Sequence, residues 1–228
     1  MKISVCVPTL RRYDLLDRLI QSLRTSIVMP DAIYIIDNGG QWFAPNKISA
    51  ELHFRDTCGI QHHYYKFSVG NLGLAASWNF FVEKVPEVRV ICNDDILFTP
   101  NAIGALLDAY TPDAVVSPAS IVGGNAFSCF VLPDQIVRDV GLFDVSISPF
   151  WAYLEDNDYF RRMTLKGYGI SAAPDSVVEH PVSSTLRAFS PDELAEHHRK
   201  FRTAQGNYRR KWGGLPGNEV FTTPYQEE

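Results

Sequence analysis

The stretch that most constrains the fold is an apolar run that ends in three polar residues. Val88–Cys92 is long enough for one β-strand buried on both faces, and Asn93, Asp94 and Asp95 follow it directly. Ionised carboxylates do not stay unpaired inside a core. The three side chains must therefore lie where the strand leaves the sheet, at its carboxyl end, where open α/β sheets bind ligands.

This acidic stretch has two interpretations. A divalent cation would relieve the repulsion between adjacent carboxylates, because such cations prefer oxygen ligands. Alternatively, the polar residues form a turn that leads to Thr99 and Pro100, which suit the N-cap and first position of a helix. The stretch by itself favours neither interpretation, and the rest of the chain has to decide.

Strand and helix patterns alternate along the first half of the chain. Apolar runs predict strands at residues 3–7, 32–36 and 88–92, and residues 62–67 are a further possible strand. Helical spacing of apolar residues predicts helices at 13–24 and 75–84. Residues 41–61 are expected to be irregular. The alternation implies an α/β fold with a mostly parallel central sheet and helices on both faces.

The second half continues the alternation less regularly. Helices are predicted at 100–110, 133–140 and 158–166, and short strands at 114–117, 128–132, 169–173 and 177–179. Ser190, Pro191 and Glu193 carry the signature of a helix start, with a cap, a proline at the first position and an acid at the third. That helix is expected to run to Trp212.

Composition excludes several classes of protein. At 46% hydrophobic residues the 228-residue chain can bury a core, and a net charge of −5 argues against bulk binding of nucleic acid. The four cysteines show no CxxC spacing and are expected to be free thiols in a reducing compartment. With no apolar stretch of membrane-spanning length and no signal-peptide pattern, we expect a cytoplasmic protein, with peripheral membrane contact left open.

Four polar loops follow the predicted strands of the first half. They are Pro8–Arg12, Asp37–Gly40, Asn71–Gly73 and Asn93–Asp95. In a parallel sheet all four open on one edge, which suits a nucleotide. An aspartate can accept a bond from a ribose or base, glycines allow close backbone approach to phosphate, and an arginine can neutralise it. Neither a GxGxxG nor a Walker loop is present.

Five motifs in this order resemble the inverting GT-A glycosyltransferases of the family 2 type: VPTLRR, IIDNGG, NLGLAASWN, CNDD and LEDNDYFRR. The resemblance covers roughly residues 1–185. It implies a GT-A catalytic domain at 1–185, with a nucleotide-binding half at 1–98 and an acceptor half at 99–185, followed by a C-terminal helix and tail at 186–228. It also implies a UDP-, GDP- or dTDP-linked sugar donor, a glycan or glycoconjugate acceptor, and a Mn²⁺ or Mg²⁺ cofactor.

The same resemblance implies roles for individual residues. The nucleotide and donor sugar would be bound by Pro8, Thr9, Arg12, Asp37, Asn71, Gly73, Asn79, Asn93 and Asp94. The family's metal-binding DxD motif maps onto residues 93–95, where Asn93 replaces the first acid and leaves Asp95 as the surest metal ligand. In many relatives a histidine after the catalytic helix is a further ligand, and His180 occupies that place.

Glu155 and Asp156 match the family's ED pair, in which the aspartate is the general base. Inversion requires a carboxylate to take the proton from the attacking acceptor hydroxyl, and Glu155 would orient its neighbour. The alternative is that the two acids, with Asp158, are N-terminal helix charges that interact favourably with the helix dipole. Trp151 is expected to contact the acceptor by stacking, although a tryptophan can also simply be buried.

Other histidines and the C-terminal cluster are left without a specific role. His62, His63, His197 and His198 are expected to be ordinary surface or core residues. Residues 208–212, which combine basic and aromatic side chains, can pack beneath the sheet, contact a diphosphate or touch an anionic membrane surface.

Two other functions stay open on the sequence. One is a non-catalytic module that binds a nucleotide sugar or a glycan, although both acids of the ED pair are present. The other is a sugar nucleotidyltransferase, which would usually carry a glycine-rich basic signature near its N-terminus that this chain lacks.

Overall fold

The computed structural model describes residues 1–122, 125–180 and 189–226. The expected domain boundary at residue 185 lies outside the described residues. The strands are β1 (Ile3–Thr9), β2 (Ala32–Asp37), β3 (Ala50–Arg55), β4 (Gln61–Lys66), β5 (Val88–Cys92), β6 (Leu97–Phe98), β7 (Ala114–Val122), β8 (Cys129–Val131) and β9 (Gly169–Glu179). The helices are α1 (Tyr13–Arg24), α2 (Leu74–Lys84), α3 (Ala102–Asp108), the 3₁₀ turn η1 (Ala126–Ser128), α4 (Asp134–Val140), α5 (Glu155–Leu165) and α7 (Pro191–Trp212).

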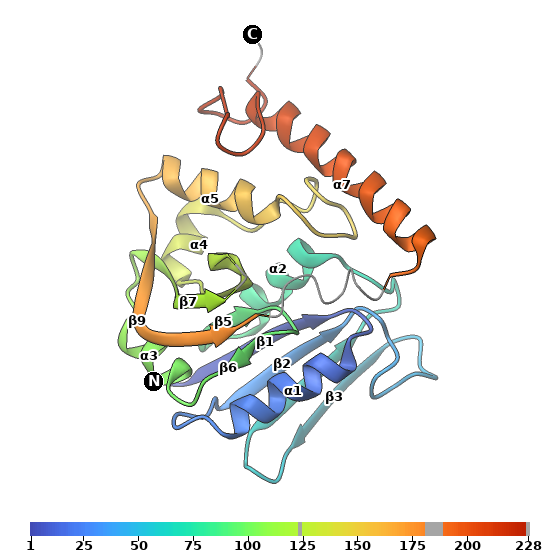
Figure 1. Cartoon of the computed structure of the whole chain (residues 1–228), viewed down its shortest axis with the longest axis vertical. Helices are drawn as coiled ribbons and strands as arrows, with labels where there is room; N and C mark the ends of the chain where they lie inside the picture. The colour runs from blue at the N-terminus through green and yellow to red at the C-terminus, as the bar shows by residue number, and fades with distance from the viewer. Residues whose placement is uncertain (123–124, 181–188, 227–228) are drawn as a thin grey trace.

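The described strands form one sheet in the order β3-β4-β2-β1-β5-β8-β7-β9-β6 (Figure 1). The strands β4, β2, β1 and β5 run parallel, as the alternation of the first half predicted. In the second half β8 is antiparallel to both of its neighbours, while β7 and β9 pair in parallel. The sheet is therefore mixed, and its parallel part is the one that collects the four polar loops at a single edge.

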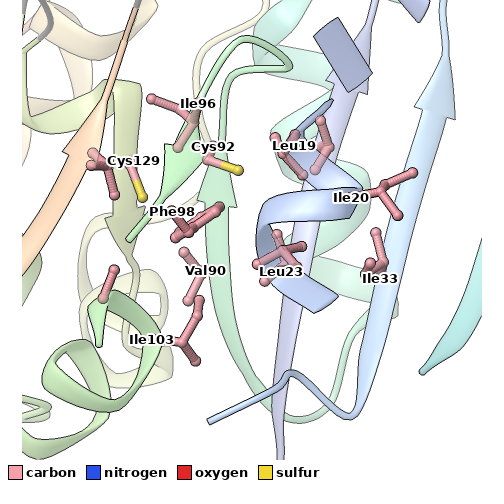
Figure 2. Close-up of a cluster of buried hydrophobic side chains, with 14 of the residues drawn as sticks. Leu19, Ile20, Leu23, Ile33, Val90, Cys92, Ile96, Phe98, Ile103 and Cys129 are labelled. Atoms are coloured by element: carbon pink, nitrogen blue, oxygen red, sulfur yellow. The ribbon is translucent and has the colours of Figure 1, made fainter. Parts of the chain in front are cut away.

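Helices cover both faces of the sheet (Figure 1). Alternate residues of each central strand point to opposite sides, so that Val5 of β1 packs with Leu19 of α1, whereas Cys6 belongs to the cluster around Trp78 of α2. Figure 2 shows the first of these clusters, in which α1 packs with residues of β2 and β5. The expected α/β fold is confirmed, with one core on each face.

The sequence suggested that residues 41–61 are irregular, but part of this region is a strand. Residues 50–55 form β3, which pairs antiparallel with β4 at the sheet edge. Its side chains alternate between exposed and half-buried, so it lacks the continuous apolar run by which buried strands are recognised. The two short strands expected at 169–173 and 177–179 are one strand, β9, whose register with β7 shifts at residues 174–176, between the two expected strands.

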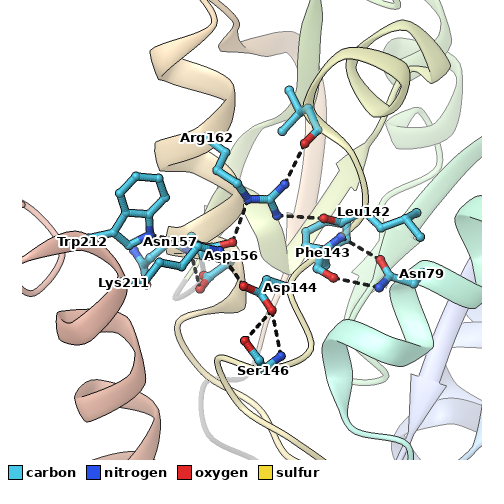
Figure 3. Close-up of polar contacts among 12 residues, drawn as sticks. Asn79, Leu142, Phe143, Asp144, Ser146, Asp156, Asn157, Arg162, Lys211 and Trp212 are labelled. Carbon is cyan, nitrogen blue, oxygen red and sulfur yellow. Dashed lines mark hydrogen bonds and ion pairs between the residues drawn. The ribbon is translucent and has the colours of Figure 1, made fainter. Parts of the chain in front are cut away.

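The long helix α7 begins as predicted and is fastened to α5 at its far end. Ser190 and Glu193 form a reciprocal capping box at its start. At its C-terminal end Lys211 and Trp212 point toward α5, where Lys211 Nζ lies 2.7 Å from Asp158 Oδ1 and 2.6 Å from Asp144 Oδ2 (Figure 3). None of the described helices combines the length and the apolar character that crossing a membrane requires.

Candidate active site

A cavity of about 490 Å³ opens at the carboxyl edge of the parallel strands. It is lined by the loops after β1, β2 and β5, by the starts of α2 and α5, by η1 and by α7. Most of the side chains that the sequence predicted for binding and catalysis meet there. They are Pro8, Thr9, Asn71, Gly73, Asn93, Asp94, Asp95, Trp151, Glu155, Asp156 and His180.

Asp94 joins the first loop to the acidic triplet. Thr9 Oγ1 donates a buried hydrogen bond of 2.7 Å to Asp94 Oδ2. Burial raises the pKa of Asp94 to about 7, and the neighbouring charge of Asp95 adds to the rise. One carboxyl group thus fixes the relative position of two predicted donor-binding loops.

Asp95 and His180 form the second contact of the acidic triplet. His180 Nε2 lies 3.0 Å from Asp95 Oδ1, and Asn93 Nδ2 lies 3.5 Å from the same ring nitrogen. The described residues hold no group of three His, Cys, Asp or Glu side chains that could by itself hold a metal ion. One carboxylate and one imidazole fit a cation that takes its remaining ligands from a bound diphosphate, as Mg²⁺ commonly does.

The negative charge of the cavity also favours a bound cation. Its described lining includes four carboxyl groups, those of Asp94, Asp95, Glu155 and Asp156, and neither Lys nor Arg. A diphosphate bound there would face acidic side chains without a protein cation among the described lining residues. A divalent cation is the group that would offset this repulsion.

Glu155 and Asp156 form the first turn of α5, directly after Tyr153 and Leu154, whose φ angles are 93° and 70°. Such left-handed conformations are strained for residues other than glycine and are often found at functional sites. The helix begins three residues earlier than the sequence indicated, so both acids lie at its N-terminus. Since both also line the cavity, the helix-dipole and catalytic interpretations are compatible.

The two acids differ in their surroundings. Glu155 is 2% exposed, and its Oε2 has no hydrogen-bond partner among the described residues. Burial, reinforced by the charge of Asp156, raises the pKa of Glu155, and burial also raises that of Asp156. Asp156 Oδ2 accepts a hydrogen bond of 3.3 Å from Asn125 Nδ2, and its Oδ1 accepts one of 2.8 Å from the backbone N–H of Asn157.

Three residues predicted to bind the donor, Arg12, Asp37 and Asn79, are not among the described lining residues. Arg12 makes a two-pronged contact with Asp14, at 3.0 and 3.1 Å. Asn79 uses both atoms of its amide on the backbone of Phe143, at 2.8 and 2.9 Å. Their contacts with a donor stay predictions.

Asp37 is already bonded by the protein on both oxygens. It is 2% exposed and accepts hydrogen bonds of 2.7–3.1 Å from the hydroxyls of Tyr13 and Tyr64 and from the backbone N–H groups of Gly39, Gly40 and Trp42. Five donors saturate a carboxylate. Asp37 therefore organises the loop after β2, and a ligand would have to displace one of these bonds to reach it.

Asn71 and Gly73 tie the loop before α2 to the segment that carries Trp151. Asn71 Nδ2 donates to the carbonyl of Phe150 at 3.2 Å, and the backbone N–H of Leu74 donates to the carbonyl of Trp151 at 2.7 Å. A Cβ atom on Gly73, which has φ +82°, would lie 2.6 Å from the backbone nitrogen of Trp151. Glycine is required here because the two backbones touch.

An aromatic group from α7 completes the wall on the side of Trp151. Trp151 Nε1 donates to His197 Nδ1 at 3.3 Å, and the ring of Tyr153 meets His197 edge-on at a centroid distance of 5.1 Å. Lys200 Nζ lies 3.9 Å from the centre of the Trp151 ring. His197 is 6% exposed, and burial lowers its pKa.

Comparison with known proteins adds evidence on the fold. No family model matches the chain. It is 25% identical to YwdF of Bacillus subtilis (strain 168), described as an uncharacterized glycosyltransferase, with 83% of this chain and 75% of YwdF covered. The mannosyltransferase PcManGT of Pyrobaculum calidifontis, solved with GDP-Man and Mn²⁺, matches with a TM-score of 0.62 at 13% identity, over 92% of this chain and 64% of its own.

TarS of S. aureus (residues 1–349), solved with UDP-GlcNAc, matches with a TM-score of 0.55 at 12% identity, over 91% of this chain and 67% of its own. The chain has the fold of these glycosyltransferases. It spans less than two thirds of the length of PcManGT and 40% of a longer TarS structure. Because the sequence identity to both is low, this likeness establishes the fold alone.

Several residues that line this cavity were given no individual role from the sequence, although Leu10 and Asn38 belong to loops that were expected to open on this edge. They are Leu10, Asn38, Leu74, Trp78, Asn125, Phe127, Ser128, Ala152, Tyr153, Phe189 and His197. His197 was taken for an ordinary histidine, because nothing in its local sequence shows that α7 returns to the cavity. Asn125, directly before η1, belongs to no recognisable motif, and its hydrogen bond to Asp156 depends on the fold.

Proposed function

We propose that this protein is a glycosyltransferase that moves a sugar from a nucleoside-diphosphate sugar to a hydroxyl of a glycan or glycoconjugate acceptor, with inversion at the anomeric carbon. The observation that carries the proposal is the position of two acidic pairs, Asp94-Asp95 and Glu155-Asp156, on the wall of one cavity. The first follows a central parallel strand, and the second opens a helix beside the acceptor-side aromatic residues. The likeness to PcManGT and TarS, solved with GDP-Man and with UDP-GlcNAc, supports a nucleotide-sugar donor.

Asp156 is the proposed general base. Its Oδ2 is held by Asn125, so the carboxylate has a defined orientation at the cavity surface. A base in this position takes the proton of the acceptor hydroxyl as that oxygen attacks the anomeric carbon from the face opposite the diphosphate. The raised pKa of Asp156 makes it a stronger proton acceptor than an exposed aspartate would be.

Asp95 and His180 are the residues that would hold a divalent cation. When bound, such a cation supplies a positive charge that offsets the charge building on the leaving diphosphate. The chain's own contribution is to orient these two side chains: Asp95 lies directly after β5, and His180 contacts its carboxylate at 3.0 Å. Thr9 and Asp94 fix the adjacent loop, which favours a role in shaping the nucleotide site.

The first experiment screens donors without knowledge of the acceptor. The full chain is incubated with UDP-, GDP- and dTDP-linked sugars in the presence of Mn²⁺ or Mg²⁺, and release of the nucleoside diphosphate is measured. We expect slow hydrolysis of one donor class, with the released sugar inverted when its anomeric configuration is read by NMR before mutarotation. Retention of configuration would refute the proposed base, and no hydrolysis or binding of any donor would refute the proposed function.

The second experiment separates the base from the donor site. Asp156→Asn should lower turnover by about 10²–10⁴-fold, the usual contribution of a general base, while donor affinity stays within a few-fold. Asp192→Asn is the matched control, because Asp192 is an exposed acid in the first turn of α7, outside the described cavity lining. If both variants lose activity equally, the effect belongs to helix starts and the base lies elsewhere.

Asp95→Ala tests the proposed cation site independently of turnover. It should abolish metal-dependent binding of the nucleoside diphosphate in calorimetry, because one of two protein ligands is lost. Unchanged binding would remove the cation from this loop.

A further inference from the structure

The part of α7 from His197 to its C-terminal end concentrates positive charge in an acidic protein. Residues 197–212 contain six of the chain's 21 Lys and Arg residues and no Asp or Glu, whereas the whole chain has 26 Asp and Glu residues and a net charge of −5. Such asymmetry within one element indicates an electrostatic partner rather than a general solubility effect.

Helical periodicity divides five of these basic residues between two faces, while the sixth, Lys200, is half-buried beside Trp151. Lys211 is buried with Tyr208 and Trp212 on the face toward α5, where it binds Asp158 and Asp144. The exposed positions carry arginines: Arg199, Arg202, Arg209 and Arg210. The basic-aromatic cluster at 208–212 is therefore split, with its aromatic members packed inside and two of its arginines outside.

We call these four exposed arginines the α7 basic face; two of them make contacts within the helix and two make no ion pair among the described residues. Arg199 pairs with Glu196 at 2.6 Å, and Arg210 donates to the side chain of Asn207 at 2.9 Å. Arg202 and Arg209 make no ion pair with any residue of the part of the chain that the structure describes. α7 lies along the outside of the molecule, away from the sheet (Figure 1).

Two exposed apolar side chains lie in the segment that follows the C-terminal end of α7. After Gly213 the chain folds back, so that the N–H of Val220 donates to the carbonyl of Trp212 and the N–H of Tyr225 donates to that of Lys211. Val220 is 73% exposed and Tyr225 is 51% exposed. A basic helix face followed by an exposed valine and tyrosine is a combination that suits the boundary between lipid headgroups and acyl chains.

We propose that the α7 basic face binds the surface of an anionic phospholipid membrane. The arginines match the negative headgroups in charge, and Val220 and Tyr225 supply the apolar contact that a soluble polyanion would not use. The opposite face of the same helix places His197 on the cavity wall. Docking through α7 would therefore hold the cavity close to the membrane, within reach of a membrane-borne acceptor. This last consequence rests on the proposed function, whereas the docking itself does not.

The test is sedimentation of the full chain with vesicles, without any nucleotide sugar. We expect binding to vesicles of phosphatidylcholine with phosphatidylglycerol, little binding to phosphatidylcholine alone, and release as salt rises. The triple variant Arg202→Gln, Arg209→Gln, Arg210→Gln should bind about 100-fold more weakly, from a contribution of about fivefold per arginine at an anionic surface.

A matched control removes the same charge elsewhere. Arg18→Gln, Lys47→Gln, Arg138→Gln changes three exposed residues outside α7 and should bind vesicles like the unaltered protein. Equal loss in both triple variants would overturn the proposal, since net charge alone would then explain binding. So would an absence of vesicle binding, or binding to soluble polyphosphate that leaves vesicles unbound, which would indicate a polyanionic partner instead. A failed vesicle assay with an active enzyme would leave the proposed function intact.

Discussion

Asp158→Asn should lower the free energy of unfolding by about 3 kcal/mol. Asp158 is fully buried, and its carboxylate receives Arg162 Nε at 2.9 Å, Lys211 Nζ at 2.7 Å and Trp212 Nε1 at 2.9 Å. Figure 3 shows Arg162 of α5 reaching toward the side on which Lys211 and Trp212 of α7 lie. Removing one partner of a buried ion pair costs about 3–5 kcal/mol, because the other charge is left uncompensated.

The lower end of that range applies because both cations keep other partners. Lys211 retains Asp144 at 2.6 Å, and Arg162 retains the carbonyl groups of Val140 and Leu142 at 2.9 and 2.8 Å. For a chain of this length, about 3 kcal/mol corresponds to a fall in Tm of about 6–12 °C. Asparagine preserves the shape of the side chain, so the loss reports charge rather than a cavity.

The assay is urea unfolding followed by tryptophan fluorescence. Glu196→Gln is the control, since it weakens the exposed Arg199–Glu196 pair, whose side chains are 66% and 39% exposed, and should cost at most about 1 kcal/mol. If Asp158→Asn costs no more than this control, the buried carboxylate is not what fastens α7 to α5.

Three further predictions concern the cavity and its supports. Gly73→Ala should cost more than Gly70→Ala, because both glycines have positive φ but only Gly73 touches the backbone at Trp151; equal losses of Tm would contradict the close packing. Asp37→Ala should lower the free energy of unfolding in urea by about 3 kcal/mol or more, because it leaves buried hydroxyl and N–H donors unsatisfied. A variant that stays stable but binds nucleotide more weakly would instead favour direct contact between Asp37 and the nucleotide. The pKa of Glu155 is higher in the folded protein than in the unfolded chain, so the protein loses stability as the pH rises above the pKa of Glu155 in the unfolded chain. Glu155→Gln removes this loss and should therefore become more stable relative to wild type from pH 5 to pH 8. A stability difference that does not change with pH would contradict this, and Glu83→Gln, at an exposed position, is the control.

The parts of the fold that the sequence predicted are those with strong periodic patterns. α1 at Tyr13–Arg24 and β5 at Val88–Cys92 have the predicted bounds, because a helical stripe and a continuous apolar run each point to one structure. β3 was missed because an edge strand exposes half of its side chains and carries charged residues among them. The antiparallel insertion of β8 was also missed, since strand order is set by contacts between distant segments.

The site was predictable where a motif follows a strand and unpredictable where the fold brings segments together. Thr9 and Asp94 were both predicted at the sheet edge, yet their hydrogen bond depends on the pairing of β1 with β5. Asp37 carries a motif, but its five donors come from several segments, and so its saturation could not be read from the local sequence. His197 has no motif, and its place on the wall depends on the path of α7.

The cavity is assembled by contacts that connect its proposed donor side, at residues 71–74, directly with its proposed acceptor side, at Trp151. The carbonyl of Trp151 holds the N–H of Leu74, and the Trp151 indole holds His197 of α7. Arg11, from the first loop, pairs with Glu193 at the start of the same helix at 3.0 Å, although this exposed pair contributes little energy. A change at Gly73 therefore moves Trp151 and, through it, the aromatic wall. Substitutions on the two sides should consequently be non-additive in a double-mutant cycle, because they share the backbone contact between residues 73 and 151.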